Sequence, residues 1–408
     1  MKNFYISLLS SLVIVSCSTV SKNTNDKRLL TEEINTIYNQ KKFNGFAVSI
    51  VDEKGTLYKN GFGFSDVENN KKYTTETIQN IGSVSKTFVG IALLKAQELG
   101  KLKLDDAIDK YLSFKVINPK FPDSKITIRQ LATHTSSITD NEFYSSKNYY
   151  LKSNQNLTGL KMSFDDDQTF NPSDSIISMK SFFENVLTEN GKWNKGSFST
   201  HQPGTIYEYS NVGTTFAAYI IEQATGQSFK DFTKKYILEP LKMKNSGWKF
   251  EDIDFSKFSR LYENPTIPLP YYELITYPDG GFITNINDLS KYLTELIKGY
   301  NGNGTILTKE SYKEYFKPQL SESNFTERNT RNPYNESYNV GIFMGFGYTG
   351  YIGHTGGDPG TMSMMFFDPK TNLGRIMIFN TNFSDKEGNK TFFDIWNVME
   401  KYQGKLKN

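Results

Sequence analysis

The stretch Ser83-Val84-Ser85-Lys86 opens the apolar segment on which the interpretation of this chain depends. Apolar residues follow it at helical spacing, and Gly100 stands where a glycine commonly ends a helix. We therefore predict a helix from Ser83 to Leu99. Residues three apart lie on the same face of a helix, so the Lys86 amine can reach the Ser83 hydroxyl.

This spacing suits a nucleophilic serine. A neutral hydroxyl needs a base beside it, and a lysine can be that base when burial or nearby positive charge lowers its pKa. Free N–H groups at a helix N-terminus also favour the oxyanion that forms when the hydroxyl attacks a carbonyl. The same spacing recurs at Ser246 and Lys249, where Gly247 and the lack of an apolar stripe predict a turn.

A second candidate motif is Tyr209-Ser210-Asn211, which precedes a helix predicted to start near Thr214. A tyrosine phenol can pass protons when a lysine ammonium lies nearby. The Asn211 amide offers a substrate both a donor and an acceptor. A tyrosine packed at a loop-to-helix junction is the alternative interpretation.

The third motif, His354-Thr355-Gly356-Gly357, lies at the end of one predicted strand and before another. A hydrogen-bonding side chain beside a hydroxyl can hold a substrate carboxylate, and glycines let a substrate approach the backbone. A histidine in a strand-end turn would give the same pattern.

The strands of the chain are predicted near its two ends. A hairpin is expected at 45–51 and 56–64, and four short strands at 338–346, 347–353, 361–367 and 374–379, followed by a helix at 391–402. Residues 101–335 look mainly helical and irregular, with a long insertion at 140–200 and a mobile loop at 318–337. We therefore predict an α+β fold over 28–405: an antiparallel sheet built from both chain ends and flanked by helices, plus an inserted, mainly helical lobe.

The N-terminus is predicted to be a targeting segment. Lys2 precedes an apolar run that ends in Ile14-Val15-Ser16-Cys17, which resembles a bacterial lipobox. We expect a lipoprotein signal peptide at 1–17, lipidation of Cys17 and a flexible polar tether at 18–27. The protein would then be exported and lipid-anchored to a bacterial membrane, on its periplasmic or cell-surface side.

Composition excludes several other classes of function. The net charge is only +3 and no Lys/Arg block occurs, so we expect no nucleic-acid partner. Cys17 is the single cysteine and there are three histidines, so we expect no disulfide, no metal and no cofactor. The oligomeric state is left open.

Together and in this order, the three motifs resemble those of the penicillin-binding protein and class C β-lactamase superfamily of serine hydrolases. The segments Thr127–Ser136 and Asp279–Phe282 also resemble that family, and the resemblance covers roughly residues 30–400. It implies an acylated nucleophile at Ser83, and proton shuttling by Lys86 and Tyr209, with the choice of general base open.

The resemblance also implies roles for the remaining motif residues. Asn211 would position substrate, and His354, Thr355 and Gly356 would line the cleft. The N–H groups of Ser83 and Gly357 would form an oxyanion hole. His134 invites a reading as a base, but the family gives the corresponding histidine no such role, and we interpret it as structural.

The third motif departs from class C β-lactamases by carrying His354 in place of a lysine. Because a neutral histidine holds an antibiotic carboxylate less well than a lysine, the sequence favours a DD-carboxypeptidase-like peptidase or an esterase. The substrate would be a small peptide, a β-lactam or an ester. A β-lactamase, or a catalytically idle member that binds peptidoglycan or a protein, are the alternatives.

Overall fold

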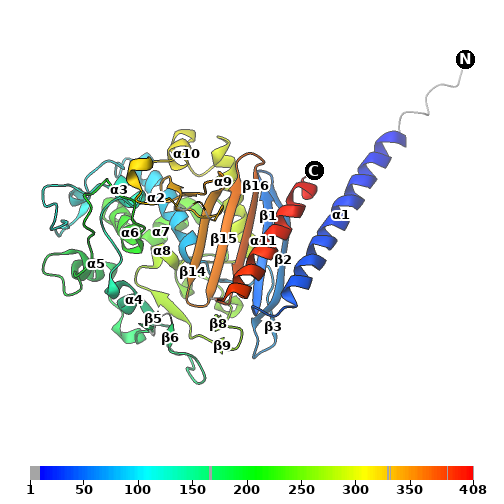
Figure 1. The fold of residues 1–408 in the computed structure, drawn as a ribbon, viewed down its shortest axis with the longest axis horizontal. Helices are drawn as coiled ribbons and strands as arrows, with labels where there is room; N and C mark the ends of the chain where they lie inside the picture. Colours follow the sequence, from blue (N-terminus) through cyan, green and yellow to red (C-terminus); the bar gives the residue numbers. More distant parts are fainter. Residues whose placement is uncertain (1–9, 165–167, 329, 331, 384, 408) are drawn as a thin grey trace, which may run out of the picture.

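The computed structural model describes residues 10–164, 168–328, 330, 332–383 and 385–407, with the side chains of 10–21 excepted. It has one large sheet with helices on both faces and a lobe of helices and loops beside it (Figure 1). The first nine residues of the predicted signal peptide lie outside the described part. The helices are α1 (Ser10–Tyr38), α2 (Lys86–Glu98), α3 (Ile128–Ala132), α4 (Glu142–Asn148), α5 (Met179–Leu187), α6 (Asn211–Thr225), α7 (Phe229–Thr233), α8 (Tyr277–Gly280), α9 (Ile286–Tyr300), α10 (Lys309–Tyr315) and α11 (Lys386–Leu406).

The main sheet is built from both ends of the chain, which confirms the predicted fold class. Its order is β12-β13-β14-β15-β16-β1-β2-β3, and every neighbouring pair is antiparallel. The two ends join where Phe46 of β1 lies opposite Phe379 of β16. The strands are β1 (Gly45–Asp52), β2 (Gly55–Asp66), β3 (Lys71–Lys72), β12 (Asn339–Val340), β13 (Gly345–Phe346), β14 (Ile352–Asp358), β15 (Thr361–Asp368) and β16 (Leu373–Phe379).

Short two-stranded pairs lie outside this sheet. They join β4 (Gln79–Asn80) to β11 (Ile283–Thr284), β5 (Tyr149–Leu151) to β10 (Tyr272–Leu274), β6 (Ser163–Phe164) to β7 (Gln168–Thr169), and β8 (Tyr262–Asn264) to β9 (Ile267–Pro268). The β5–β10 pair ties the 140–200 region to the segment before α8, close to the candidate site.

The alternation of β1 explains why helices cover both faces of the sheet. Phe46 and Val48 point into a core with α1 and α11, where Ile34 and Trp396 are fully buried. Ala47 and Val51 point to the other face and the larger core that includes α2 and α9. The sheet is therefore the middle layer of the molecule, and one of its faces supports α2, the helix that follows Ser83.

Residues 18–27, predicted to be a flexible tether, lie inside helix α1. The Asn23 amide donates to the Leu406 carbonyl at 3.3 Å, and Asp26 is buried. Because α1 packs along α11, helical structure nucleated by the apolar positions from Leu30 onward extends back through the polar segment. Cys17 also falls within the α1 backbone, and no described helix is both long and apolar enough to cross a membrane.

The strands predicted at 338–346 and 347–353 are wrong in their bounds. Gly347 donates its backbone N–H to Tyr351 at 2.9 Å, and Gly350 has φ +94°. These residues form the turn between β13 and β14, so the strand that we expected to end at Gly353 begins at Ile352 instead. The His354 motif consequently lies within a strand.

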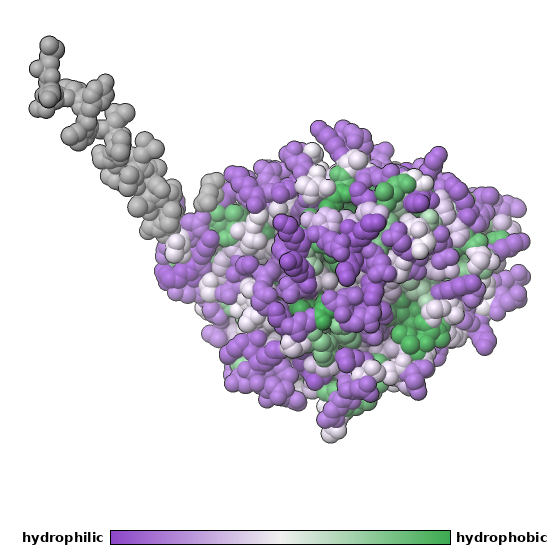
Figure 2. Space-filling model, turned by 180° about the vertical axis from the view of Figure 1, so that it is seen from behind, coloured by the Kyte–Doolittle hydropathy of each residue, from purple (hydrophilic) through white to green (hydrophobic). Residues whose placement is uncertain are grey.

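The surface carries few concentrated apolar areas. Mean hydropathy is −0.52, and Figure 2 shows a mostly hydrophilic face with separate hydrophobic patches. The large apolar side chains that are exposed are scattered along the chain, which is usual for a folded domain.

Candidate active site

Ser83 lies in a tight turn directly before α2. The turn η1 (Gly82–Ser85) is a 3₁₀ turn and α-helical bonding begins at Lys86, so the helix starts three residues later than predicted. Gly82 has φ +53°, a conformation that favours glycine. Ser85 is buried, and its hydroxyl accepts the Phe282 N–H at 3.1 Å. This hydrogen bond holds the turn in place, while Ser83 stays partly exposed.

Lys86 is fully buried beneath Ser83. Its Nζ donates to Ser83 Oγ and to the Asp279 carbonyl oxygen, each at 2.8 Å. Burial lowers the pKa of Lys86, because the charged form loses its hydration. The charges that oppose this shift are those of Asp279, Asp140, Asp358 and Glu336.

The Tyr209 ring completes this group. Lys86 Nζ lies 5.1 Å from the centroid of the Tyr209 ring, and the centroid of the His354 ring lies 6.2 Å from it. Burial raises the pKa of Tyr209 well above its ordinary value, although a hydrogen bond with Ser83 opposes that shift. At neutral pH Tyr209 is therefore a phenol rather than a phenolate.

His134 supports Tyr209 from behind. The two rings stack with centroids 4.7 Å apart, and His134 Nδ1 accepts the Ser210 N–H at 3.1 Å. Burial places the pKa of His134 well below its ordinary value, with Lys86 adding to the effect, so the ring is neutral. Its contacts fit the structural interpretation: it fixes the tyrosine loop.

Asn211 is the first residue of α6, and its amide is already engaged. Asn211 Nδ2 donates to Asp140 Oδ2 at 2.7 Å, and Asp140 also accepts the backbone N–H groups of Asn211 and Val212. A carboxylate at a helix N-terminus is favoured by the helix dipole. Sequence reasoning missed Asp140, because it begins the polar 140–200 region and no local pattern links it to Asn211.

The third motif forms the free part of an edge in the sheet. On one side β14 pairs with β15 along its whole length. On the other side β13 pairs only with Ile352 and Gly353, so that side of His354–Asp358 faces the Ser83 turn. A Cβ on Gly82 would lie 2.6 Å from the Gly357 nitrogen, and one on Gly356 would lie 2.1 Å from the Ile81 carbonyl oxygen. These glycines let the backbones of turn and strand touch, so Gly357 lies directly against the turn that carries Ser83.

Glu336 is an acidic neighbour of this strand that the sequence did not reveal. Thr355 Oγ1 donates to Glu336 Oε1 at 2.5 Å, and His354 Nδ1 lies 3.4 Å from the same oxygen. Burial lowers the pKa of His354, although Glu336 opposes this effect. Glu336 belongs to the segment that we interpreted as a mobile loop, where no periodicity marks a functional residue.

Asp279 supports Lys86 through a network of its own. Its carboxylate accepts the Tyr144 hydroxyl and the Thr215 hydroxyl, each at 3.0 Å. Burial raises the pKa of Asp279 to about 6, and the charge of Lys86 opposes this shift. The carboxylate is therefore ionised above that pH and acts on Lys86 in the neutral range.

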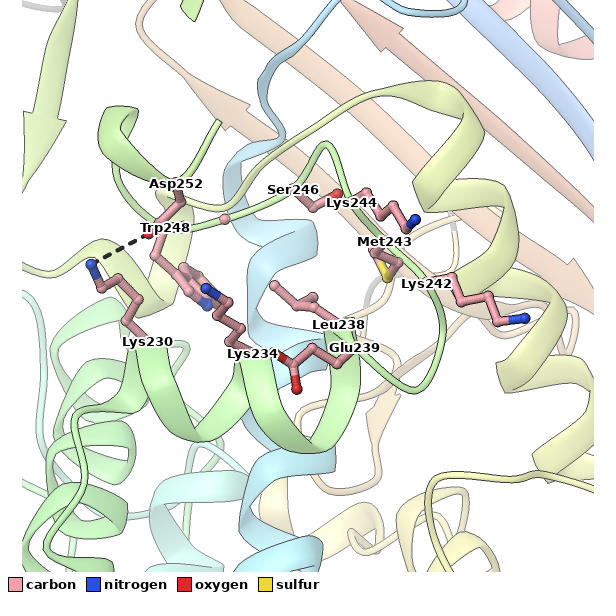
Figure 3. Close-up of a pocket in the computed structure, with 11 residues that line it drawn as sticks. Lys230, Lys234, Leu238, Glu239, Lys242, Met243, Lys244, Ser246, Trp248 and Asp252 are labelled. Carbon is pink, nitrogen blue, oxygen red and sulfur yellow. Dashed lines mark hydrogen bonds and ion pairs between the residues drawn. The ribbon is translucent and has the colours of Figure 1, made fainter. Parts of the chain in front are cut away.

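A pocket of about 330 Å³ (Figure 3) is lined by none of these residues. Ser246 lines it, and its hydroxyl is engaged with Thr284 and Asp288, while Lys249 pairs with Glu273 at 3.8 Å. The second Ser-x-x-Lys therefore does not form a serine–lysine pair like that of Ser83. Among the described residues, no group of three or more His, Cys, Asp or Glu side chains is placed to hold a metal ion.

The site gathers a hydroxyl, a buried amine and a phenol at the edge of an antiparallel sheet. This arrangement is the one expected of serine hydrolases related to β-lactamases and penicillin-binding proteins. The family model described as beta-lactamase matches residues 30–399, and the chain belongs to that family.

Individual relatives are distant. Protein flp of Staphylococcus aureus (strain MW2) is 25% identical over 346 residues, which cover 83% of this chain and 60% of that protein. Penicillin-binding protein 4* of Bacillus subtilis (strain 168) is 25% identical over 361 residues, which cover 84% of this chain and 69% of that protein. The chain thus spans about 60% of the length of the flp relatives that it matches.

Solved structures share the fold. A penicillin-binding protein homologue from Pyrococcus abyssi superposes with a TM-score of 0.70 at 23% identity, covering 91% of this chain and 76% of that one. The D-amino acid amidase of Ochrobactrum anthropi SV3 gives a TM-score of 0.64 at 20% identity, covering 91% of this chain and 99% of the amidase. These likenesses establish the β-lactamase and penicillin-binding protein architecture.

Proposed function

We propose that this protein is a serine hydrolase that forms an acyl-enzyme at Ser83, as a DD-carboxypeptidase-like peptidase or an esterase acting outside the cytoplasm. The observation that carries the proposal is the 2.8 Å contact between Ser83 Oγ and the buried Lys86 amine. A lysine held in this way has little role in folding, since burying a charge costs free energy. The same burial prepares it to accept a proton.

Lys86 is the general base of this proposal, and Tyr209 carries protons as a phenol. Burial shifts the two pKa values in opposite senses, favouring the neutral amine and the neutral phenol. Neutral Lys86 takes the Ser83 proton as Oγ attacks the substrate carbonyl. The N–H groups of Ser83 and Gly357 bind the resulting oxyanion.

The second half of the cycle uses the same groups in reverse. The proton taken by Lys86 passes to the leaving amine or alkoxide, with the Tyr209 phenol as the relay, and the acyl group remains on Ser83. Water then attacks the ester, gives its proton to the same pair and releases the acid, and Ser83 recovers its hydrogen. The names of the relatives support acyl chemistry of this kind, since one is an amidase and another binds penicillin.

Active-site labelling tests the proposal. A fluorophosphonate and a fluorescent penicillin should label the folded protein, and Ser83→Ala should remove all labelling and turnover because no nucleophile remains. Ser246→Ala is the matched control, since it alters the other Ser-x-x-Lys and should keep full labelling.

Turnover is then screened with a D-Ala-D-Ala peptide, a chromogenic cephalosporin and short p-nitrophenyl esters. Folded protein that takes neither label and hydrolyses none of these substrates would contradict the proposal and favour a catalytically idle binding protein. Equal labelling of Ser83→Ala would assign the chemistry to another residue.

We also propose that the protein is exported and lipid-anchored through Cys17, so that a bacterial membrane is its partner. The lipobox-like end of the apolar N-terminal run supports this proposal. Several acyl chains on one cysteine bind a membrane firmly, since each buried CH₂ contributes about 0.8 kcal/mol.

A further inference from the structure

Carboxylates dominate the charges around Ser83, which opposes the binding of a substrate carboxylate. Four carboxylates act on Lys86, those of Asp279, Asp140, Asp358 and Glu336. The two histidines that could balance them, His134 and His354, are kept neutral by burial. Lys86 must itself be neutral to act as a base, so the reactive form of the site carries a net negative charge.

Glu336 is the member of this set that occupies the substrate-facing motif. It takes the Thr355 hydroxyl hydrogen bond at 2.5 Å, the donor that the sequence had suggested for a substrate carboxylate. Its second close contact, to His354 Nδ1 at 3.4 Å, also falls on Oε1. Within the described residues Oε2 has no hydrogen-bond partner, so this oxygen is left for a donor on the substrate.

The backbone fixes Glu336 in this position. Its carbonyl accepts the Phe346 N–H at 3.3 Å, and a Cβ on Gly345 would lie 2.1 Å from the Glu336 Cβ. The neighbouring Ser337 hydroxyl is held by Tyr207 at 3.1 Å. The Glu336 side chain is only 14% exposed, so its carboxylate is part of the built site.

We infer that Glu336 determines specificity, making the site prefer substrates with an ammonium group near the scissile bond and reject those with a free carboxylate there. The inference rests on the proposed function. It narrows the proposed substrates to amides and esters that carry a cationic or neutral group near the scissile bond. A peptide ending in a free D-alanine carboxylate would meet an engaged Thr355 hydroxyl and a like charge. An ammonium would instead pair with Glu336 in surroundings that screen charge poorly.

Two sets of p-nitrophenyl and phenyl esters test the inference. One set varies the acyl side, with D-alanine, N-acetyl-D-alanine and N-succinyl-D-alanine p-nitrophenyl esters. The other varies the leaving group, with phenyl acetates bearing a para trimethylammonium, carboxamide or carboxylate group. Wild-type kcat/KM should fall from cation to neutral to anion in at least one set, with about tenfold or more between the extremes.

The isosteric variant Glu336→Gln should flatten that order by slowing the cationic ester and accelerating the anionic one. Labelling of this variant by an uncharged fluorophosphonate, carried to completion, checks that Ser83 is still accessible and reactive. Glu310→Gln, an exposed carboxylate on α10, is the matched control and should keep the wild-type order.

The inference fails if the wild type prefers the anionic esters, or if Glu336→Gln changes all members of both sets by the same factor. A protein that hydrolyses none of the esters and takes no label refutes the proposed function instead. Turnover that depends on Ser83 but ignores substrate charge refutes only the role of Glu336.

Discussion

Single residues show which parts of the site a sequence can reveal. Ser83 and Lys86 were predicted to meet because three-residue spacing on a helix is a local rule, and they lie 2.8 Å apart. Tyr209 was placed by resemblance to a family. Asp140 and Glu336 were missed, because a carboxylate in an irregular segment gains its meaning only from distant partners.

The pH dependence of catalysis is predicted to follow Lys86. The enzyme becomes active as Lys86 loses its proton, so kcat/KM rises with pH through a pKa that burial has lowered. The Asp279 charge raises that pKa, and Asp279 is ionised above about pH 6. Asp279→Asn should therefore lower the pKa of Lys86 further and move the rising limb to lower pH.

A pH profile of kcat/KM with a neutral p-nitrophenyl ester, corrected for spontaneous hydrolysis, measures this shift. Asp109→Asn, at an exposed carboxylate that pairs with Lys125, is the control and should leave the limb in place. A limb that stays fixed or moves to higher pH in Asp279→Asn would remove Lys86 from the role of base.

At the scale of elements, the site depends on the backbone contact between turn η1 and strand β14. The sequence located both segments, but it placed His354 at a strand end because the Gly347–Tyr351 turn looked like extended chain. Glycines such as Gly82 and Gly356, where a Cβ would collide with the facing backbone, leave no periodic signal in the sequence. Their effect can be judged only once the turn and the strand are seen together.

Gly82→Ala tests that contact. The new Cβ would lie 2.6 Å from the Gly357 nitrogen, so turn and strand must separate, and φ +53° adds about 1–2 kcal/mol of strain. A displacement of about 1 Å at the nucleophile is expected to lower kcat/KM by about 100-fold.

Gly100→Ala separates the strain at positive φ from the steric collision. Gly100 has a similar φ of +68°, and nothing lies within 4 Å of the position that its Cβ would take. The variant should lose the stability that the φ strain costs, measured by urea unfolding, while retaining kcat/KM. Equal activity losses in the two variants, or full activity in Gly82→Ala, would show that the contact between η1 and β14 does not position Ser83.

For the whole molecule, the sequence predicted the architecture, whereas the segment 18–27, expected to be a tether, lies within helix α1. Strands alternating at both chain ends indicated one shared sheet, and the sheet order confirms it. The segment 18–27 could not be predicted as helical from its own polar residues. Its helical form depends on α11, which lies at the opposite end of the sequence (Figure 1).

The anchoring proposal makes a prediction at this scale as well. When the full chain is expressed in a bacterium, it should incorporate a fatty-acid label and sediment with membranes, because acylated Cys17 would hold it there. Cys17→Ser should lose the label, while Ser18→Ala should keep it. A Cys17→Ser protein that is still labelled and membrane-bound would place the anchor elsewhere.

The junction of β1 with β16 has a consequence for biosynthesis. The Gly45 N–H donates to the Asn380 side chain at 2.9 Å across 335 residues of sequence, so this junction cannot form until almost all of the chain has been made. Pairings of such long range slow folding, and until they form β1 presents an unpaired, apolar strand edge. A nascent or prematurely terminated chain would therefore expose this edge, which favours aggregation.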